Sequence, residues 1–412
     1  MDTARHLQVF DFTLAAFPAG VLINKTMETI IAPYEKRLYD RRLVPAGGAI
    51  FGIAGEKHRW SRRCGKIPVL SRLLDLIPAA SILFARPAEP YNTLFNYLAA
   101  TASGAVCPDD SETRAFLVDL PIIDRFSADA MARPLASRKC LIIRDHGILA
   151  VGQDGPSAAY VNFAAACFAC FVKFFSDFLQ DTQAGRMTAP QKKAFDDAVK
   201  NLPPAPAFAG GLVTGPFETP EAVQAAMVEA GAQIVSLGLV DACFGNLSYR
   251  VSNALFISKS GSFLDGLEGD IARCAMEDPV CAGQNPSSEY PAHLEIYRST
   301  DAGAILHGHP LFSVIMSMDC PVACDHRGDC HRRCPYERNI RNTPVVSGET
   351  GDGPFGLYTT VPAMIKEKKA AIVYGHGVFT AAATDFNDAL ARMAGVEQRC
   401  RAAYFEALNA LS

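Results

Sequence analysis

The sequence predicts an α/β protein built from two similar halves in tandem, and three observations support this. The chain has 412 residues, more than one hydrophobic core usually organises. Strand-like apolar runs at 255–258, 304–306 and 371–374 alternate with helical stretches at 220–237 and 385–408. Two short sequences also recur in the same order along the chain, so a repeated α/β unit is the expectation.

The repeat rests on two pairs of similar segments. ILFARP (82–87) recurs as ILHGHP (305–310), and CLIIRDHGILAVGQD (140–154) parallels AIVYGHGVFTAAATD (371–385). The interval from Arg86 to His146 is close to that from His309 to His376, so the two copies are collinear. A weaker pairing sets FGIAGEK, from Phe51, against FGNLSYR.

Proline and glycine mark the boundary between the copies. They concentrate in NLPPAPAFAGGLVTGP, so we expect a first copy over 1–189, a linker over 190–216 and a second copy over 217–412. The apolar run at 158–175 contains Asn162 and Lys173 and barely reaches the length of a membrane span. It is therefore predicted to be a buried core helix.

The charge composition argues against nucleic acid and membranes as partners. The chain carries 39 basic and 43 acidic side chains, a net charge of −4, so nothing attracts nucleic acid or an anionic membrane. The N-terminal stretch MDTARHLQVFDF lacks the basic and apolar segments of a leader, which predicts a cytoplasmic protein. Thirteen cysteines, an odd number, then favour buried thiols or metal ligands over disulfides.

Three histidines are candidate metal ligands. His307 and His309 lie two apart at the end of an apolar run, so on a strand both side chains project from the same face. His376 lies between two glycines, which let a ligand or substrate approach the backbone. Three imidazoles with an open position suit a catalytic zinc or a similar ion. The alternatives are a hydrogen-bonded histidine pair at a strand end and a turn histidine.

The segments upstream supply a carboxylate and anion-binding groups. NPSSEYPAHLEIY indicates a helix start, whose free N–H groups and hydroxyls can bind an anion. Glu289 is either an ordinary first-turn glutamate favoured by the helix dipole or, beside a metal, a general base. The stretches at 244–250 and 257–270 are rich in Gly, Ser and Asn, which either cradle phosphate or simply form turns.

Taken in order, GNLSYR, SKSGSFLDGL, PSSEYPAHLEIY, AILHGHP and GHGVF resemble the class II aldolase and adducin-like family over the whole second copy. That family includes metal-dependent sugar-phosphate aldolases, a pentulose-phosphate epimerase, a thiosugar-phosphate dehydratase and the non-enzymatic heads of adducin. The resemblance implies a central, mainly antiparallel sheet flanked by helices in each copy. It also implies a homo-oligomer, a dimer or tetramer of tandem chains.

The resemblance assigns roles to individual residues. His307, His309 and His376 would hold a divalent ion, Zn²⁺ first and Mn²⁺, Co²⁺ or Fe²⁺ as alternatives, and Glu289 would be the acid/base. The substrate phosphate would be bound by Asn246, Ser260, Gly261, Ser287 and Ser288.

These assignments predict a function with two rivals. The expected activity is a metal-dependent aldolase acting on a small phosphorylated sugar or ketose through a metal-stabilised enediolate. A sugar-phosphate dehydratase is the neighbouring alternative, and an adducin-like scaffold is the rival from another class. Glu289 and the complete ligand set favour an enzyme. Epimerisation is expected less than the other two reactions, because the resemblance implies that the epimerase has no glutamate at the position of Glu289.

The first copy matches the family far less well. Phe84 and Arg86 stand where the metal-binding histidines belong, Ile53 replaces the phosphate-site asparagine, and the Ser-Ser-Glu segment is absent. His146 remains at the third position, where a structural role is expected. The first copy is predicted to be degenerate and non-catalytic, with the hypothesis that it lends residues or surface to the second.

An insertion at 318–341 departs from the family pattern. Its cysteines are spaced C-x3-C-x5-C-x3-C, and they are Cys320, Cys324, Cys330 and Cys334. Four thiols so close could form a second, structural zinc site. Reduced thiols and local disulfides are the alternatives, and the neighbouring arginines are either a phosphate-facing or a solvated patch.

Overall fold

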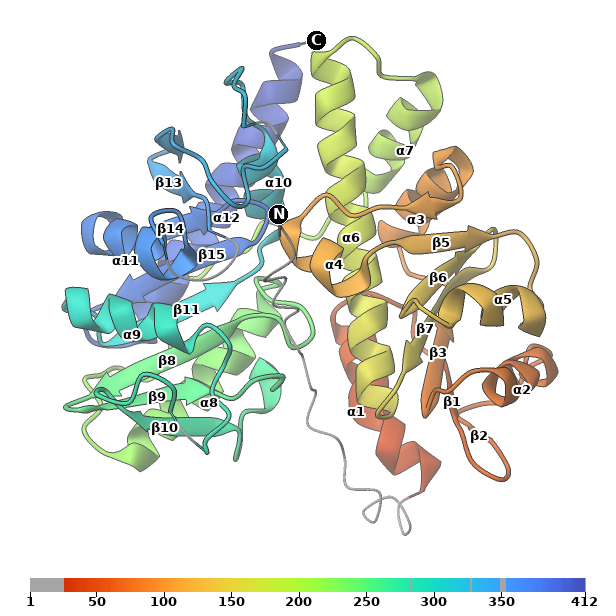
Figure 1. Cartoon of the computed structure of the whole chain (residues 1–412), viewed down its shortest axis with the longest axis horizontal. Coiled ribbons are helices and arrows are strands. Elements are labelled where there is room, and N and C mark those ends of the chain that lie inside the picture. The colour runs from red at the N-terminus through yellow and green to blue at the C-terminus, as the bar shows by residue number, and fades with distance from the viewer. Residues whose placement is uncertain (1–25, 282, 327, 349–352, 412) are drawn as a thin grey trace, which may run out of the picture.

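The computed structural model describes residues 26–281, 283–326, 328–348 and 353–411, so the N-terminal stretch MDTARHLQVFDF lies outside the described residues. The chain folds into two α/β halves that lie side by side (Figure 1). The first half contains α1 (Met27–Asp40), β1 (Ile50–Ile53), β2 (Arg59–Trp60), α2 (Ile67–Leu76), β3 (Ser81–Ala85), α3 (Tyr91–Thr101), β4 (Ala105–Val106), α4 (Ser111–Leu117), β5 (Leu120–Ile123), α5 (Ala128–Leu135), β6 (Cys140–Ile143), β7 (Gly147–Gly152), α6 (Pro156–Gln183) and α7 (Ala189–Val199).

The second half opens with α8, where the Thr219 side chain accepts a hydrogen bond from the backbone and Pro220 occupies the first turn. Its elements are α8 (Pro220–Ser236), β8 (Asn246–Val251), β9 (Ala254–Ser258), β10 (Ile271–Ala275), α9 (Tyr290–Ser299), β11 (Ala304–Gly308), α10 (Leu311–Met318), β12 (Arg338–Ile340), β13 (Thr343–Val346), α11 (Leu357–Lys368), β14 (Ala370–Val373), β15 (Gly377–Ala382) and α12 (Phe386–Asn409). The α/β prediction is therefore confirmed.

The two sheets share one plan of connection. The first has the strand order β2-β1-β3-β7-β6-β5-β4, and the second has β10-β9-β8-β11-β15-β14-β13-β12. Each is antiparallel except for one parallel pair, β5 with β6 and β13 with β14. Each strand of the first sheet thus has a counterpart in the second, which adds only β10 at one edge.

Strand register corrects one of the sequence-based matches. His307 on β11 pairs with Asn246 and Phe379, and Phe84 on β3 pairs with Ile50 and Leu149. The residue that occupies the asparagine position in the first sheet is therefore Ile50. The prediction of Ile53 is wrong. It came from aligning Phe51-Gly52 with Phe244-Gly245, which sets Ile53 against Asn246, but the strand register sets Ile50 at that position.

Helix α6 lies between the two halves and joins their cores (Figure 1). Phe171 and Phe175 of α6 contact Phe312 of α10 at ring distances of 5.9 and 5.6 Å, and Phe175 contacts Tyr404 of α12 at 5.7 Å. Among the described residues α6 alone has the length and apolar composition to cross a membrane, and 94% of its apolar window is buried inside the protein. The predicted core helix is confirmed.

The predicted linker is partly wrong. Its first ten residues belong to α7, which packs on α3 and α6, so the extended connection begins only after Val199. That connection is fixed to α12: Leu212 N donates to Asn387 Oδ1 at 3.0 Å, and Gly215 N donates to Asp385 Oδ2 at 3.0 Å. Because one apolar cluster runs through both halves, they do not have fully separate cores.

The cysteines depart from the expectation at one pair. Cys274 of β10 and Cys281 form a disulfide, although the composition favoured thiols throughout. The two sulfurs meet because they lie seven residues apart on a strand and the turn that follows it. The other described cysteines are free thiols.

Candidate active site

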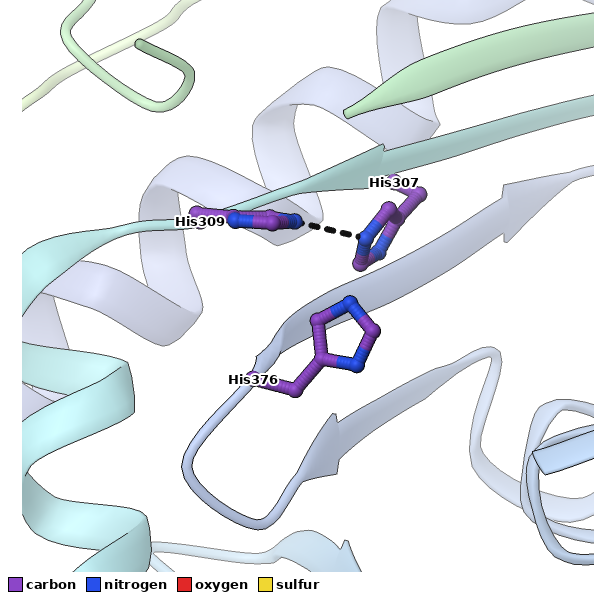
Figure 2. Close-up of side chains that lie close together, drawn as sticks. All are labelled: His307, His309 and His376. Carbon is purple, nitrogen blue, oxygen red and sulfur yellow. Dashed lines mark hydrogen bonds between the residues drawn. The ribbon is translucent and has the colours of Figure 1, made fainter. Parts of the chain in front are cut away.

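The structure brings the three predicted ligand histidines together. His307 is on β11, His309 lies just beyond its end, and His376 lies in the tight turn between β14 and β15 (Figure 2). One ligand atom from each ring lies within 4.8 Å of the others. Strands β11 and β15 pair directly, so the sheet itself carries ligands that are far apart in the sequence to one point.

Hydrogen bonding fixes which nitrogen of His307 faces that point. Its Nδ1 lies 3.2 Å from the Val378 carbonyl oxygen, which can only accept, so Nδ1 carries the proton and Nε2 offers a lone pair. Phe379 stacks on the ring at 4.1 Å. His309 Nε2 lies 2.9 Å from His307 Nε2, the contact drawn in Figure 2.

Burial keeps these rings neutral. His307 is 1% exposed, and desolvation, with smaller contributions from His309 and His376, holds its pKa well below the usual range. Burial likewise lowers the pKa of His309, and it lowers the pKa of His376 to about 4. Neutral imidazoles are the form that can donate lone pairs to a cation.

Gly377 makes the approach of the turn to the strand possible. A Cβ at this position would lie 2.4 Å from the Gly308 carbonyl oxygen and 2.9 Å from ring atoms of both His307 and His309. No side chain fits in that space. Gly377 therefore lets the turn pack closely on β11 and its histidines, whereas the sequence predicted that the glycines beside His376 admit a ligand or substrate to the backbone.

Glu289 places its carboxylate among the histidines. Its Oε2 lies 3.2 Å from His307 Nε2, and its Oε1 lies 3.4 Å from His376 Nε2. Asn246 Nδ2 donates to Oε2 at 2.7 Å. Although Glu289 immediately precedes α9, its side chain makes no capping hydrogen bond, so the ordinary first-turn interpretation does not describe it.

The environment of Glu289 suits proton transfer. The residue is 7% exposed, and burial raises its pKa to about 7, while the hydrogen bond from Asn246 acts in the opposite direction. A carboxyl group with a pKa near neutrality can both accept and release a proton in that range. The position of Glu289 among the histidines and its raised pKa are therefore those that an acid/base would need.

The residues present fit a divalent cation. Of the eight buried side-chain polar atoms without a hydrogen-bond partner among the described residues, three belong to this site, and they are Asn246 Oδ1, Glu289 Oε1 and His376 Nδ1. Leaving such atoms unsatisfied costs about 1–3 kcal/mol each, so their clustering indicates a bound polar species. Three neutral imidazoles beside a carboxylate are the donor set that zinc and similar ions prefer.

The predicted phosphate-binding residues line the same pocket. Asn246, Ser260, Gly261, Ser287 and Ser288 surround it together with Glu289 and the triad. Two backbone bonds join the loops: Ser260 N donates to Asn285 O at 3.1 Å, and Ser287 N donates to Ser258 O at 3.0 Å. The serine-rich turns are thus held side by side, although the Asn246 amide is directed to Glu289.

Sequence reasoning missed several residues of this pocket. Lys259 lies within the SKSGS segment and adds a cation to the pocket wall, and 243–245 line it before β8 begins. Glu112 comes from α4 of the first half, and its Oε2 lies 3.4 Å from His376 Nε2. The Lys259 signal was present in the motif. No pattern in the sequence connects Glu112 with His376.

The cysteine-rich insertion gives a second metal site no support. Its four cysteines are free thiols, and among the described residues the histidine triad is the one group of three or more potential ligands that meets. Arg338 anchors the insertion by donating to the Ser317 and Asp319 carbonyl oxygens at 2.8 Å each. The insertion includes β12, the edge strand of the second sheet.

The corresponding positions of the first half make other contacts. Phe84 packs against Phe126 at 5.2 Å, and Arg86 Nε donates to Asn92 Oδ1 at 3.0 Å. His146 lies in the β6–β7 turn and contacts Phe126 at 5.3 Å. These side chains serve packing and loop structure instead of forming a ligand set.

Comparison with known proteins points to one family. The model of the class II aldolase and adducin N-terminal domain matches residues 225–404. A methylthioribulose-1-phosphate dehydratase from Granulibacter bethesdensis is 29% identical over 204 residues, which cover 45% of this chain and 93% of that protein. A 5-methylthioribulose-1-phosphate/5-deoxyribulose-1-phosphate aldolase from Rhodospirillum rubrum is 33% identical over 108 residues, covering 26% of this chain and 49% of that protein.

A solved structure of similar type is the L-fuculose-1-phosphate aldolase from Thermus thermophilus. It is 25% identical, has a TM-score of 0.36, and the match covers 45% of this chain and 93% of that one. Residues 225–404, which the family model matches, contain the triad, Glu289 and the serine-rich turns. The C-terminal half of this chain belongs to the class II aldolase and adducin N-terminal domain family.

Proposed function

We propose that this protein is a metal-dependent lyase acting on a small ketose 1-phosphate. One observation carries the proposal: the Glu289 carboxylate lies within 3.4 Å of two of the three histidines that converge in a buried triad. A scaffold has no need of a buried carboxylate beside buried imidazoles, because each buried polar group costs free energy. The names of the related proteins and the polar turns of the pocket support a phosphorylated ketose as the substrate.

Each part of the site has a task in such a reaction. A divalent cation, when bound, stabilises negative charge that develops on substrate oxygens. His307, His309 and His376 would hold that cation, and Glu289 would take a proton from the carbon next to the ketone or from the hydroxyl group one carbon further along. Ser260, Gly261, Ser287 and Ser288 offer hydroxyl and backbone N–H groups to the phosphate, and Lys259 adds a positive charge.

Dehydration is the reaction we favour. It removes a proton from C3 and expels the C4 hydroxyl as water, whereas aldol cleavage removes the C4 hydroxyl proton and breaks the C3–C4 bond. Relatives named as dehydratases match over 93% and 87% of their length. Aldol cleavage is the second candidate, because a relative with that activity in its name matches over a shorter region.

The two reactions are distinguished by their products. Metal-free protein loaded with zinc is incubated with 5-methylthioribulose 1-phosphate, and the products are identified by mass spectrometry. Loss of one water with an intact carbon chain supports dehydration, and dihydroxyacetone phosphate with an aldehyde supports cleavage. Zinc-loaded wild-type protein that yields neither with any ketose 1-phosphate contradicts the proposal.

We also propose that the first half is a diverged copy of the second. The shared strand order and the single parallel pair at the same place in each sheet support this origin. Assembly into dimers or tetramers of tandem chains is part of the same proposal. The measurement is the molecular mass in solution, and a strictly monomeric active protein would count against assembly.

A further inference from the structure

Glu112 is a residue of the first half that reaches the site of the second. It lies in α4, at the centre of the molecule between the two sheets (Figure 1), and its side chain is 14% exposed. Its Oε2 and the Oε1 of Glu289 both lie 3.4 Å from His376 Nε2. Two carboxylates from different halves therefore face the same imidazole nitrogen, and both line the pocket.

The position of Glu112 is built into the contact between the halves. The preceding residue, Ser111, donates from its backbone N at 2.7 Å and from its Oγ at 3.0 Å to the Gly375 carbonyl oxygen. Gly375 N in turn donates to Ser317 Oγ at 2.8 Å. The turn that carries His376 is thus tied to the start of α4, one residue from Glu112.

Two further contacts hold α4 in place. The buried side chain of Asp110 caps the helix, accepting from Thr113 N at 2.7 Å. Phe116, on the last turn, meets Phe244 of the second half edge-on at 5.3 Å. A short helix fixed at both ends to the opposite half keeps its side chains at defined positions, so Glu112 does not depend on a flexible loop.

We propose that Glu112 is the second proton-transferring residue of the active site and that the first half is therefore part of the catalytic unit. The inference rests on the proposed lyase function. Both reactions considered there need one group that removes a proton and another that delivers one. Glu289 alone supplies a single carboxylate, and Glu112 is the other carboxylate among the residues that line the pocket.

The proton balance of dehydration assigns the two roles. Glu289 takes the proton from C3, and the electron pair of the broken C–H bond ends in a new C3=C4 double bond. The C4–O bond breaks, and the departing hydroxyl group takes a proton from the Glu112 carboxyl and leaves as water. Exchange of protons with solvent returns Glu289 and Glu112 to their starting forms.

The test separates the two proton transfers in the full-length chain. Wild type, Glu112→Gln, Glu112→Asp and Glu289→Gln are compared, and Glu56→Gln serves as control because Glu56 is an exposed glutamate of the same half. Zinc affinity is measured by competition with a chelator. Exchange of the C3 hydrogen of 5-methylthioribulose 1-phosphate in deuterated water and overall turnover are measured on the zinc-loaded proteins.

We expect Glu112→Gln to bind zinc within about threefold of wild type and to retain C3 exchange, since general acid–base groups act on proton transfer only. Its turnover should fall roughly 100-fold or more. Glu112→Asp should recover part of that loss, Glu289→Gln should lose exchange and turnover together, and Glu56→Gln should match wild type.

Three results for Glu112→Gln would overturn the assignment. Turnover within about threefold of wild type would remove Glu112 from the chemistry, because an acid/base group contributes far more. A zinc affinity more than about tenfold weaker would make it a metal ligand, and loss of C3 exchange would place it in the first proton transfer. Wild-type protein that neither exchanges nor turns over any ketose 1-phosphate overturns the proposed function, and this inference with it.

Discussion

At the scale of single residues, the site depends on imidazoles and a carboxylate that burial brings into contact. His307 owes its free Nε2 to the bond that its Nδ1 makes with the Val378 carbonyl oxygen. Glu289 owes its raised pKa to burial and its position to Asn246. The proposed function assigns the three histidines to holding a cation and Glu289 to moving a proton, and substitutions should separate the two tasks.

Glu289→Gln should retain zinc and lose turnover. The amide has nearly the same shape and can still accept the hydrogen bond from Asn246, but it cannot take a proton. The loss expected for a general base is roughly 100- to 10,000-fold. His309→Ala is the matched comparison, and it should lose the metal. Metal analysis of both variants beside the turnover assay checks this, and a Glu289→Gln protein with wild-type rates would refute the role.

Gly377→Ala should weaken zinc binding without touching a ligand. The new methyl group would meet the Gly308 carbonyl oxygen and two ligand rings at 2.9 Å or less, and strain of this kind typically costs about 1–3 kcal/mol. Gly65→Ala is the control, because a Cβ there meets nothing within 4 Å. Zinc affinity and thermal unfolding are the measurements. Equal zinc affinities for the Gly377→Ala and Gly65→Ala proteins would show that the turn can move to accommodate the methyl group.

At the scale of elements, the helix that follows His309 is held by a buried carboxylate. Glu397 of α12 accepts hydrogen bonds from Phe312 N and Ser313 N, at 2.9 and 2.8 Å, and from Ser313 Oγ at 2.8 Å. These N–H groups lie in the first turn of α10 and have no partner within the helix. The contact couples the long C-terminal helix to the strand end that carries the ligands.

Glu397 should make stability depend on pH. Burial raises its pKa to about 7, above the value of about 4.3 expected in an unfolded chain. A carboxyl group with a raised pKa binds its proton more tightly in the folded state, so its contribution is fully present below pH ~4.3 and is lost as pH rises through about 7. Glu397→Gln has no such titration.

The free energy of unfolding of wild type, relative to Glu397→Gln, should therefore fall between about pH 4.5 and pH 7.5. The change should be on the order of 3 kcal/mol, at about 1.4 kcal/mol per unit of pKa shift. Urea unfolding of both proteins across this range measures it. An identical pH dependence for the two proteins would mean that the carboxyl keeps an ordinary pKa in the folded state.

The cysteine-rich insertion should bind no structural metal. Its four thiols do not meet as a ligand group, whereas the triad does, so the chain should hold about one zinc ion. Metal analysis of protein prepared under reducing conditions checks the stoichiometry. Replacement of Cys320 and Cys330 by serine should leave the zinc content unchanged. Two zinc ions per wild-type chain, with only one in that variant, would instead support a second site.

At the scale of the whole molecule, the first half is joined to the second through a shared core. Helix α6 packs its aromatic side chains on α10 and α12, and α4 ties the His376 turn to the first half. The first half, whose described residues include no group of metal ligands, thereby remains part of the folded unit. The contact between the halves therefore resembles the interior of a single domain, and cutting the chain between the halves should destabilise both.

Neither half should fold alone. Separation after residue 199 would expose the buried aromatic face of α6 on one piece and the matching faces of α10 and α12 on the other. We expect each half expressed by itself to aggregate and the two to become soluble when produced together. Size-exclusion chromatography of the single and co-expressed halves is the measurement, and a soluble, zinc-binding second half would contradict this.

The sequence by itself determined the α/β class, the recurrence of similar segments, and the choice of the three histidines and Glu289 that the structure brings together. Those features are readable because they are local: His307 and His309 share a strand face by two-residue periodicity, and the glycines beside His376 indicate close backbone approach. The core helix was equally clear, since its apolar run continues through every face. Patterns of this kind depend on neighbours along the chain.

Only the tertiary structure decided what crosses between the halves. Glu112 lies in a short helix with no motif around it, and its place beside His376 follows from the docking of Ser111 on Gly375. The Ile50 register, the length of α7 and the Cys274–Cys281 bond likewise depend on pairing and packing over distance. Contacts between residues that are far apart in the sequence produce no periodic pattern along the chain, and only the folded backbone brings such side chains together.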